Sequence, residues 1–368
     1  KASCVDACIF YGMSKDGEKP AGGTMAHVDD LRSHGEPGYF AEYAQKVSCH
    51  LDVGSSDVGA VQEFTGKIYH QVDEGMLVHQ DKYIENKLTE VTIDASRKNR
   101  AAPVTDEERS EAHIAKGKVQ WIMQTRPELQ VRCLLISSAL SSKDRMYVEH
   151  LHQLNTLVTQ VKRTRHLRRL WRKIPKPWKL VVWPDASLGS KLAGAETKSI
   201  GCSVIALMTD DPNNREVKGK DSLCSVLLVK ASTIKRVCVA VFDSECLQAV
   251  RAVDLAIGVR DLVLETQRGP MGRTEHDSHI LPIDIWTDSE SVANCVNGGN
   301  APALEMRRRL DIAYLREAIE IDDVRMIGHI EAEYNIADPG TKCLPPTAPT
   351  FRRLCMALYE GIYKGTPW

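Results

Sequence analysis

The chain has 368 residues, 43% of them hydrophobic, and its 48 Lys+Arg nearly balance 49 Asp+Glu for a formal net charge of −1. At ~100–200 residues per domain, this length indicates two or three domains and enough apolar content to exclude disorder as the default. Near-neutral charge excludes a uniformly basic nucleic-acid coat, although the total can hide a local basic segment. Eleven cysteines without a CxxC pair or zinc-type spacing predict reduced thiols in an intracellular protein. Neither a secretory leader nor a membrane span is visible, and a chain starting at Lys1 is expected to be part of a longer protein.

The first half of the chain predicts hairpins followed by helices. Residues 4–93 contain short apolar runs broken by Gly, Asp and Ser, which indicate strands, hairpins and one or two helices. Thr105 and Glu108 have capping-box spacing, so we expect a helix to begin there and to run to about residue 123. Two more helices are expected at 128–140 and 145–173, the second with one apolar face.

A separate α/β unit is expected after Pro175 and Pro177, because proline lacks the amide that a continuing helix needs. The element order βββαβαβα predicts a mixed five-stranded sheet flanked by helices. Strands are expected at 178–185, 201–209, 222–228, 283–287 and 324–329, helices at 241–265 and 303–320, and a helical tail at the end. The fold class is therefore α/β (α+β) and multidomain.

Four isolated carboxylates of this unit stand at ends of strands or starts of helices: Asp185, Glu245, Asp288 and Asp338. Brought to one edge of a sheet, they would repel one another unless divalent metal neutralised them. Two Mg²⁺ ions about 4 Å apart, with Mn²⁺ as the alternative ion, could then clamp a phosphodiester for hydrolysis. Taken singly, Asp288 and Asp338 could be helix N-caps and Glu245 a solvated helix residue, and these interpretations stay open.

Asp29 and Asp30 form a second acidic position, at the tip of an expected strand hairpin. Adjacent residues of a strand point to opposite faces, so one carboxylate could reach a metal while the other supports the turn. A polar turn before Leu31 explains the same pair without any metal.

A basic segment follows Glu149, and no acidic residue occurs again until Asp185. Its positive charges would suit the phosphate backbone of a nucleic acid, whereas a solvated helix face is the alternative interpretation. The residues expected to bind nucleic acid are Lys162, Arg163, Arg165, Arg168, Arg169, Arg172 and Lys173.

Read in order, these features resemble the C-terminal part of a copia-type LTR retrotransposon Pol polyprotein. In the N-terminal half, four segments are similar to family motifs of the reverse transcriptase palm and connection. They are Val5–Phe10 ("DPCLF"), His27-Val28-Asp29-Asp30 (Tyr-Val-Asp-Asp, with His for Tyr), Gly75–Ile84 ("GxLxQxxYI") and Gly117–Trp121 with Thr125–Leu129 ("GSLxW…TRPDL"). The resemblance implies a partial reverse transcriptase palm over 1–100, with Asp29 and Asp30 as polymerase carboxylates, and a helical thumb or connection over 101–176.

The C-terminal half is similar to the ribonuclease H part of the same family. The matching segments are Asp185-Ala186-Ser187, Lys198–Gly201, Lys235-Arg236-Val237 with Asp243-Ser244-Glu245, Thr287-Asp288-Ser289, Leu310–Glu317 and Asn335–Lys342. The resemblance implies a ribonuclease H-like domain over 177–345, followed by a helical tail over 346–368. It makes Asp185, Glu245, Asp288 and Asp338 the catalytic, metal-binding acids.

Three departures from the family pattern bear on function. His329 stands where the copia pattern has an aromatic residue, and we expect it to be structural. Pro184 lies in an expected central strand, where a missing amide costs a hydrogen bond, so it signals a bulge or a decayed copy. The polymerase also needs a further metal-binding Asp from an upstream strand, so polymerase activity is expected only if the upstream palm is supplied.

The expected function is therefore Mg²⁺-dependent hydrolysis of RNA in RNA–DNA hybrids by a retrotransposon reverse transcriptase/ribonuclease H fragment. The alternative is a captured, non-catalytic remnant that acts as a structural or nucleic-acid-binding subunit. Expected partners are an RNA–DNA hybrid or other nucleic acid and the upstream Pol portion or a larger assembly, with no membrane. The expected location is the cytoplasm, a virus-like particle or the nucleus.

Overall fold

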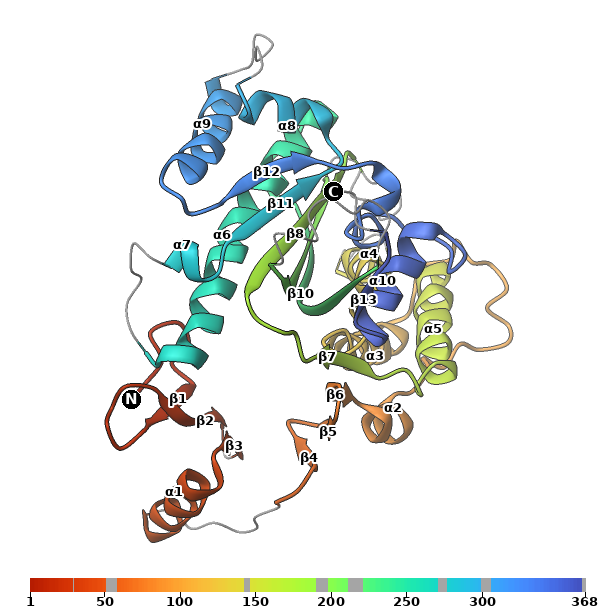
Figure 1. Cartoon of the computed structure of the whole chain (residues 1–368). Helices are drawn as coiled ribbons and strands as arrows, with labels where there is room; N and C mark the ends of the chain where they lie inside the picture. The colour runs from red at the N-terminus through yellow and green to blue at the C-terminus, as the bar shows by residue number, and fades with distance from the viewer. Residues whose placement is uncertain are drawn as a thin grey trace.

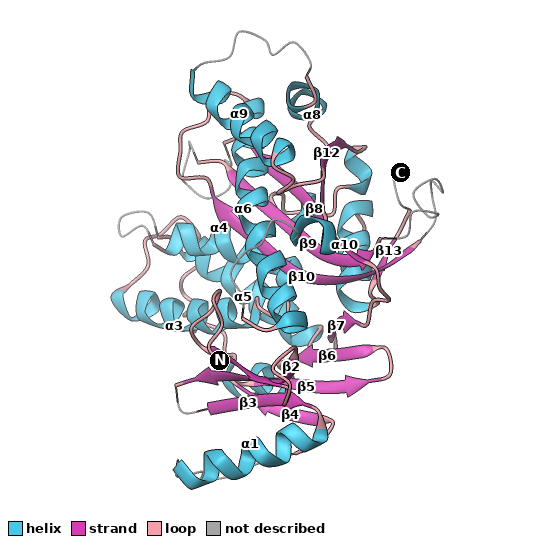
Figure 2. Ribbon diagram, turned by 60° about the vertical axis from the view of Figure 1, so that its left-hand side comes forward, coloured by secondary structure: helices cyan, strands magenta, loops and turns pink. Residues whose placement is uncertain are grey.

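The computed structural model describes residues 1–28, 30–50, 58–141, 146–189, 198–210, 221–270, 277–298 and 306–365. Helices and strands form a mixed α/β arrangement with three sheets (Figure 1). The largest sheet and its helices lie at one end of the molecule, and the N-terminal strands lie at the other (Figure 2). Within the described part of the chain, no helix is both long and apolar enough to cross a membrane.

The N-terminal region is a three-stranded antiparallel sheet followed by a helix. The predicted hairpin around the Asp-Asp pair is confirmed, because His27 pairs with Asp30 across the turn between two neighbouring strands. Asp29 itself lies outside the described residues. The elements are β1 (Ile9–Met13), β2 (Pro20–His27), β3 (Asp30–Gly35) and α1 (Pro37–His50).

A four-stranded antiparallel sheet connects this region with the helices. Its last strand, β7 (Arg169–Arg172), pairs with β6 and lies within residues 145–173, where the sequence predicts a helix. That prediction is wrong beyond Arg163, because the apolar spacing of the helix stops at Val161 and pairing with β6 makes residues 169–172 a strand. The other strands are β4 (Val61–Phe64), β5 (Lys67–Val72) and β6 (Gly75–His79).

The helical part packs around its own apolar core. The predicted capping box is confirmed: the Thr105 hydroxyl accepts from the Glu108 amide at 3.2 Å, and the Glu108 carboxylate accepts from the Thr105 amide at 2.8 Å. These bonds satisfy backbone donors that a helix start leaves free. The elements are α2 (Asp81–Lys87), α3 (Asp106–Ile122), η1 (Pro127–Leu129), α4 (Gln130–Leu140) and α5 (Val148–Arg163).

The largest sheet has the strand order β12-β11-β8-β9-β10-β13. The first three strands in sequence are antiparallel neighbours, whereas β11 runs parallel to both β8 and β12, so the predicted mixed sheet is confirmed. A short sixth strand, β13, adds to the β10 edge, so the predicted helical tail ends in a strand. The strands are β8 (Trp178–Ser187), β9 (Ile200–Thr209), β10 (Ser222–Thr233), β11 (Ile283–Thr287), β12 (Met326–His329) and β13 (Ile362–Tyr363).

Helices cover both faces of this sheet. Successive residues of β8 alternate between two cores, so Leu180 and Val182 pack beneath α6, while Val181 and Trp183 pack beneath α10. Each face of the strand is thus buried by a different helix layer. The helices are α6 (Val241–Arg268), α7 (Asp277–Ile280), α8 (Glu290–Val296), α9 (Met306–Glu320) and α10 (Pro349–Tyr359), with short turns η4 (Ala332–Tyr334) and η5 (Asp338–Gly340).

Pro184 does not interrupt the central strand. The pairing of β8 with β9 is one-to-one from Trp178 to Ser187, so the predicted bulge is absent from this pair. On the other side, the ladder between β8 and β11 ends at Val182. The Leu180 amide donates to the Pro282 carbonyl at 2.8 Å. Because the backbone groups of successive residues point to opposite neighbours, those of even-numbered residues in β8 point toward β11. The backbone of Pro184 therefore points toward β11, but beyond the last paired residue, Val182. At this position the missing amide costs no hydrogen bond between the strands.

Candidate metal centre

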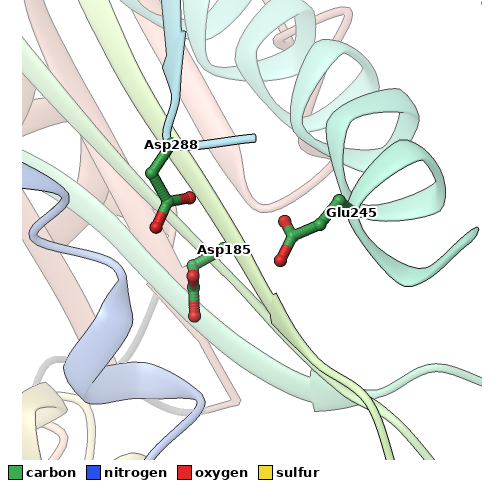
Figure 3. Close-up of side chains that lie close together, drawn as sticks. All are labelled: Asp185, Glu245 and Asp288. Carbon is green, nitrogen blue, oxygen red and sulfur yellow. The ribbon is translucent and has the colours of Figure 1, made fainter. Parts of the chain in front are cut away.

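Three of the four acidic residues singled out from the sequence meet at one edge of the largest sheet. Asp185 is near the end of β8, Asp288 directly follows β11, and Glu245 is in the second turn of α6. One carboxylate oxygen from each residue lies within 4.8 Å of the other two. Figure 3 shows the three side chains close together, with Glu245 reaching from its helix toward the two aspartates. Parallel strands end at the same sheet edge, which explains why Asp185 and Asp288 meet.

The start of α6 brings Glu245 to this edge. The Asp243 carboxylate accepts from the backbone amides of Val239 and Ala240 at 3.0 and 3.1 Å, which fixes the first turn of the helix. Arg308 of α9 pairs with the same carboxylate at 3.2 Å. Two residues later, the Glu245 Oε1 atom accepts from the Ala186 amide at 3.3 Å. The helix start is therefore tied to the end of β8 beside Asp185.

Two of the three carboxylates are buried and the third, Asp288, is half-buried, without enough positive charge to compensate them. Asp185 is 1% exposed and Glu245 is 7% exposed. Burial, followed by the charge of Asp288, raises the pKa of Asp185 to about 7. Burial, followed by the charge of Asp185, raises the pKa of Glu245 to about 9. Burial also raises the pKa of Asp288. Removal from water disfavours the ionised form and is the first cause of all three shifts, and like charges within the cluster add to it for Asp185 and Glu245.

One oxygen of this cluster stands out. The Glu245 Oε2 atom is buried and has no hydrogen-bond partner among the described residues. A buried carboxylate oxygen without a partner is costly, so its presence requires an explanation such as an ion. Three carboxylates are hard oxygen donors of the kind that Mg²⁺ and Mn²⁺ prefer. The residues present therefore fit a divalent cation.

Asp338, the fourth predicted acid, is held apart from the cluster. It begins the short turn η5, and its carboxylate binds the Lys342 ammonium and accepts from the Thr350 hydroxyl at 3.1 Å. Burial lowers the pKa of Lys342, but the carboxylates of Asp185, Asp338 and Asp288 outweigh it and the net shift is upward. The structure thus brings three predicted acids together and pairs the fourth with a lysine beside them.

Asp30, one of the two carboxylates that the resemblance assigns to a polymerase, forms no comparable site with other described residues. Asp30 is exposed at the start of β3, and Asp29 lies outside the described residues. Among the residues that the structure places, the one group of three or more potential metal ligands is the Asp185 cluster. The alternative interpretation of Asp30 as part of a polar turn agrees with its exposure.

The basic segment is not one continuous surface. Arg169 is 6% exposed, and its guanidinium donates to the carbonyls of Gln124 and Val226 at 3.0 and 2.8 Å, so the expectation that it contacts nucleic acid is wrong. Arg169 lies in β7, and its guanidinium reaches the place where the register between β10 and β9 shifts. Sequence reasoning that predicted a helix here could not reveal this position. Arg172 donates to the Glu360 carbonyl at 2.8 Å.

The exposed members of the segment are Arg163, Arg165, Arg168 and Lys173, while Lys162 and Arg172 are half-buried. Arg168 has an acidic neighbour in space, Asp81, at 3.7 Å. The segment precedes β8, whereas Asp185 is near the end of that strand. At ~3.3 Å per residue, Trp178 and Asp185 are roughly 23 Å apart along β8.

Two residues that hold the acids were missed by sequence reasoning. The Thr341 hydroxyl donates to Asp185 Oδ2, and the Asn335 amide donates to Asp288 Oδ1 at 3.0 Å. Both belong to the segment Asn335–Lys342, in which only Asp338 was given a role. The available signal was the placement of polar side chains beside Ile336 and Ala337, which are buried.

No protein-family model matches this chain, and no curated protein matches it at a significant level. Among solved structures, it is similar to the N-terminal RNase H domain of a Mycobacterium tuberculosis protein fused to maltose-binding protein, with 15% identity and a TM-score of 0.28, covering 45% of this chain and 91% of that chain. LC11-RNase H1, isolated from compost by a metagenomic approach, has 13% identity and a TM-score of 0.29, covering 44% and 91% of the two chains.

The same compost enzyme in complex with an RNA/DNA hybrid has 14% identity and a TM-score of 0.26, again covering 44% of this chain and 91% of that chain.

Proposed function

We propose that this chain hydrolyses the RNA strand of RNA–DNA hybrids, using divalent metal held by Asp185, Glu245 and Asp288. The observation that carries the proposal is the cluster of three carboxylates, two of them buried, in which one buried oxygen has no partner among the described residues. Mg²⁺, or Mn²⁺ as the alternative, would supply Lewis-acid stabilisation of a phosphodiester and an activated water when bound there.

The protein's own residues fix the geometry of this centre. The Ala186 amide holds one oxygen of Glu245, the Thr341 hydroxyl holds one oxygen of Asp185, and the Asn335 amide holds one oxygen of Asp288. Each carboxylate thus receives at least one neutral donor, which orients it without cancelling its charge. Such outer contacts are what makes a set of acids a defined binding site.

The choice of an RNA–DNA hybrid as substrate rests on the resemblance to copia-type Pol. The three clustered acids are the ones that this resemblance assigns to ribonuclease H, and the mixed sheet places them at one edge. Asp338 would complete the family's set only if Lys342 released it. Under the same proposal, residues 1–100 derive from a polymerase palm, and Asp29 and Asp30 would act only together with an upstream portion.

Hybrid cleavage by the purified chain tests this proposal. With Mg²⁺ present, the RNA strand of a labelled hybrid should be cut, EDTA should stop the reaction, and Asp288→Asn should abolish it. Failure of the wild-type chain to cut the hybrid, also in a longer protein that includes the upstream portion, would refute the enzymatic proposal. Hybrid binding that is unaffected by Asp288→Asn, without cleavage by either protein, would instead support a captured, non-catalytic nucleic-acid-binding subunit.

A further inference from the structure

The gap between the ends of β8 and β11 is closed by a side chain. Both strands continue beyond the last ladder pair, Ile285 with Val182, and Pro184 on the β11 side has a carbonyl but no amide. The Asn335 Nδ2 group donates to that carbonyl at 2.9 Å and to Asp288 Oδ1 at 3.0 Å. A single carboxamide therefore links the backbone of one strand to the acid that ends the other.

The orientation of Asn335 is determined by its surroundings. The residue is 0% exposed, and its Oδ1 atom accepts from the Ala337 amide at 3.1 Å. Turning the amide around would place its oxygen against the Pro184 carbonyl and the Asp288 carboxylate, with no hydrogen between them. Both ends of the carboxamide are thus satisfied in one orientation only.

A neutral donor suits this position better than a cation would. An Arg or Lys would hold Asp288 equally well, but its charge would compete with any metal ion for the carboxylate. The Asn335 bond lowers the pKa of Asp288 against the larger, opposite effect of burial, and it leaves the negative charge in place.

We infer that Asn335 is a positioning residue that sets the place of Asp288 relative to Asp185 by tying it to the Pro184 carbonyl. This inference rests on the proposed metal-dependent function of the same cluster. Residues that hold a metal-ligating carboxylate in this way typically contribute 10- to 100-fold to metal affinity or activity. Asn335 acts through Asp288, because its Nδ2 group donates to that carboxylate and its Oδ1 atom already accepts from the Ala337 amide.

Asn155 offers a matched control in the helical part of the chain. Its Nδ2 group donates to the Val91 carbonyl at 2.9 Å, and its Oδ1 atom accepts from the Val91 amide at 2.8 Å. The carboxamide therefore makes the same kinds of backbone bonds as Asn335 and lacks only the bond to a carboxylate. Asn335 is buried and Asn155 is half-buried, so substitution of either by Ala removes one carboxamide with backbone partners.

The experiment is a Mn²⁺ titration by calorimetry on the full chain, with circular dichroism to verify folding. We expect Asn335→Ala to weaken Mn²⁺ binding by about 10-fold or more, and excess metal to restore hybrid cleavage, while Asn155→Ala binds Mn²⁺ like the wild type. If Asn335→Ala does not fold, Asn335→Gln retains the amide but displaces it, and the same loss of affinity is expected.

Equal Mn²⁺ affinities for the wild type and the folded Asn335 variant would overturn the inference and leave the proposed function standing. A wild-type chain that binds no Mn²⁺ would overturn both. A loss of affinity in Asn155→Ala as large as in Asn335→Ala would show that general destabilisation, and not the placement of Asp288, is the cause.

Discussion

The two ends of the strand pair β8–β11 differ in how their acidic side chains are compensated. The end where β8 begins is called the paired end, because its carboxylate binds basic side chains, and the end with the acidic cluster is called the unpaired end. At the end where β8 begins, Asp284 of β11 is 2% exposed and binds Lys179 at 3.2 Å and Arg325 at 2.7 and 2.6 Å. Arg325 also binds Asp210 at 2.9 Å, and burial, which lowers its pKa, is outweighed by these carboxylates, so that the net shift is upward. At the far end, Asp185 and Asp288 meet Glu245, and Lys342, whose charge acts on both aspartates, is bound to Asp338.

This difference separates a carboxylate that the protein itself neutralises from a cluster that it leaves largely uncompensated. A buried carboxylate surrounded by guanidinium and ammonium groups is already neutralised, so it has no use for a metal. A buried cluster of carboxylates that lacks such partners destabilises the metal-free fold, and a protein retains it where a cation or a substrate uses the charge. Burial of acidic residues alone would not distinguish the two ends of these strands, whereas their partners do.

The largest expected effect is on activity. Asp288→Asn removes a ligand from the unpaired end, and we expect hybrid cleavage to fall by roughly 10³-fold, since metal stabilisation of the transition state amounts to several kcal/mol. Rates of RNA-strand cleavage in Mg²⁺ provide the measurement. Wild-type rates in this variant would mean that the cluster is not the active site.

The same substitution at the paired end should act on stability with the opposite sign. Asp284→Asn leaves Lys179 and Arg325 without their buried carboxylate, so we expect the free energy of unfolding to fall by about 3–5 kcal/mol. In contrast, Asp288→Asn should raise it in EDTA, because it removes a carboxylate that repels Asp185. Urea unfolding of both variants at pH 8 tests the comparison. The comparison would fail if both variants lost the same stability.

The pH dependence of the metal-free protein should reveal the unpaired end. The folded-state pKa values of Asp185 and Glu245, about 7 and about 9, lie above those of the unfolded chain. Their contribution to stability is therefore fully present below about pH 4 and is lost as the pH rises through 7 and 9. In EDTA, Asp185→Asn should flatten this decline and stabilise the protein by about 2 kcal/mol at pH 8. Urea unfolding across pH 5–9 would contradict the account if the wild type and the variant ran parallel.

The smallest effects are expected in the basic segment that precedes the paired end. Arg165→Ala removes an exposed cation, so hybrid affinity should weaken slightly and the slope of log affinity against log salt should fall by about 1, without a change in stability. Arg169→Met should instead lower stability, because it leaves the carbonyls of Gln124 and Val226 unpaired. Filter-binding and urea unfolding would refute this division if the two variants behaved alike.

Local patterns in the sequence were sufficient for much of the fold. The strand Ile283–Thr287 and the capping box at Thr105 follow from short-range spacing, and the meeting of Asp185 with Asp288 follows from two parallel strands. The features that could not be predicted depend on contacts between distant segments. Strand β7 forms because β6 offers a partner, although nothing within residues 164–173 excludes a helix.

The site shows the same limit. The pairing of Asp338 with Lys342 has a local signal, since the two residues are four apart in the sequence. The sequence gives no signal that this pairing keeps Asp338 out of the acidic cluster. Pro184 predicts a broken central strand when only the sequence is considered, because the sequence does not show that the ladder with β11 ends at Val182. Asn335 gains its role from that same gap, so its function could be recognised only in three dimensions.

A thermal-shift titration with Mg²⁺ at pH 8 tests the central claim most directly. The wild type and Asp284→Asn start from different melting temperatures, but both should rise with Mg²⁺ concentration because both retain the unpaired cluster. Asp288→Asn should start higher than the wild type in EDTA and respond little to Mg²⁺. A rise in Asp288→Asn equal to that of the wild type, or no rise in the wild type at all, would contradict a metal centre at Asp185, Glu245 and Asp288.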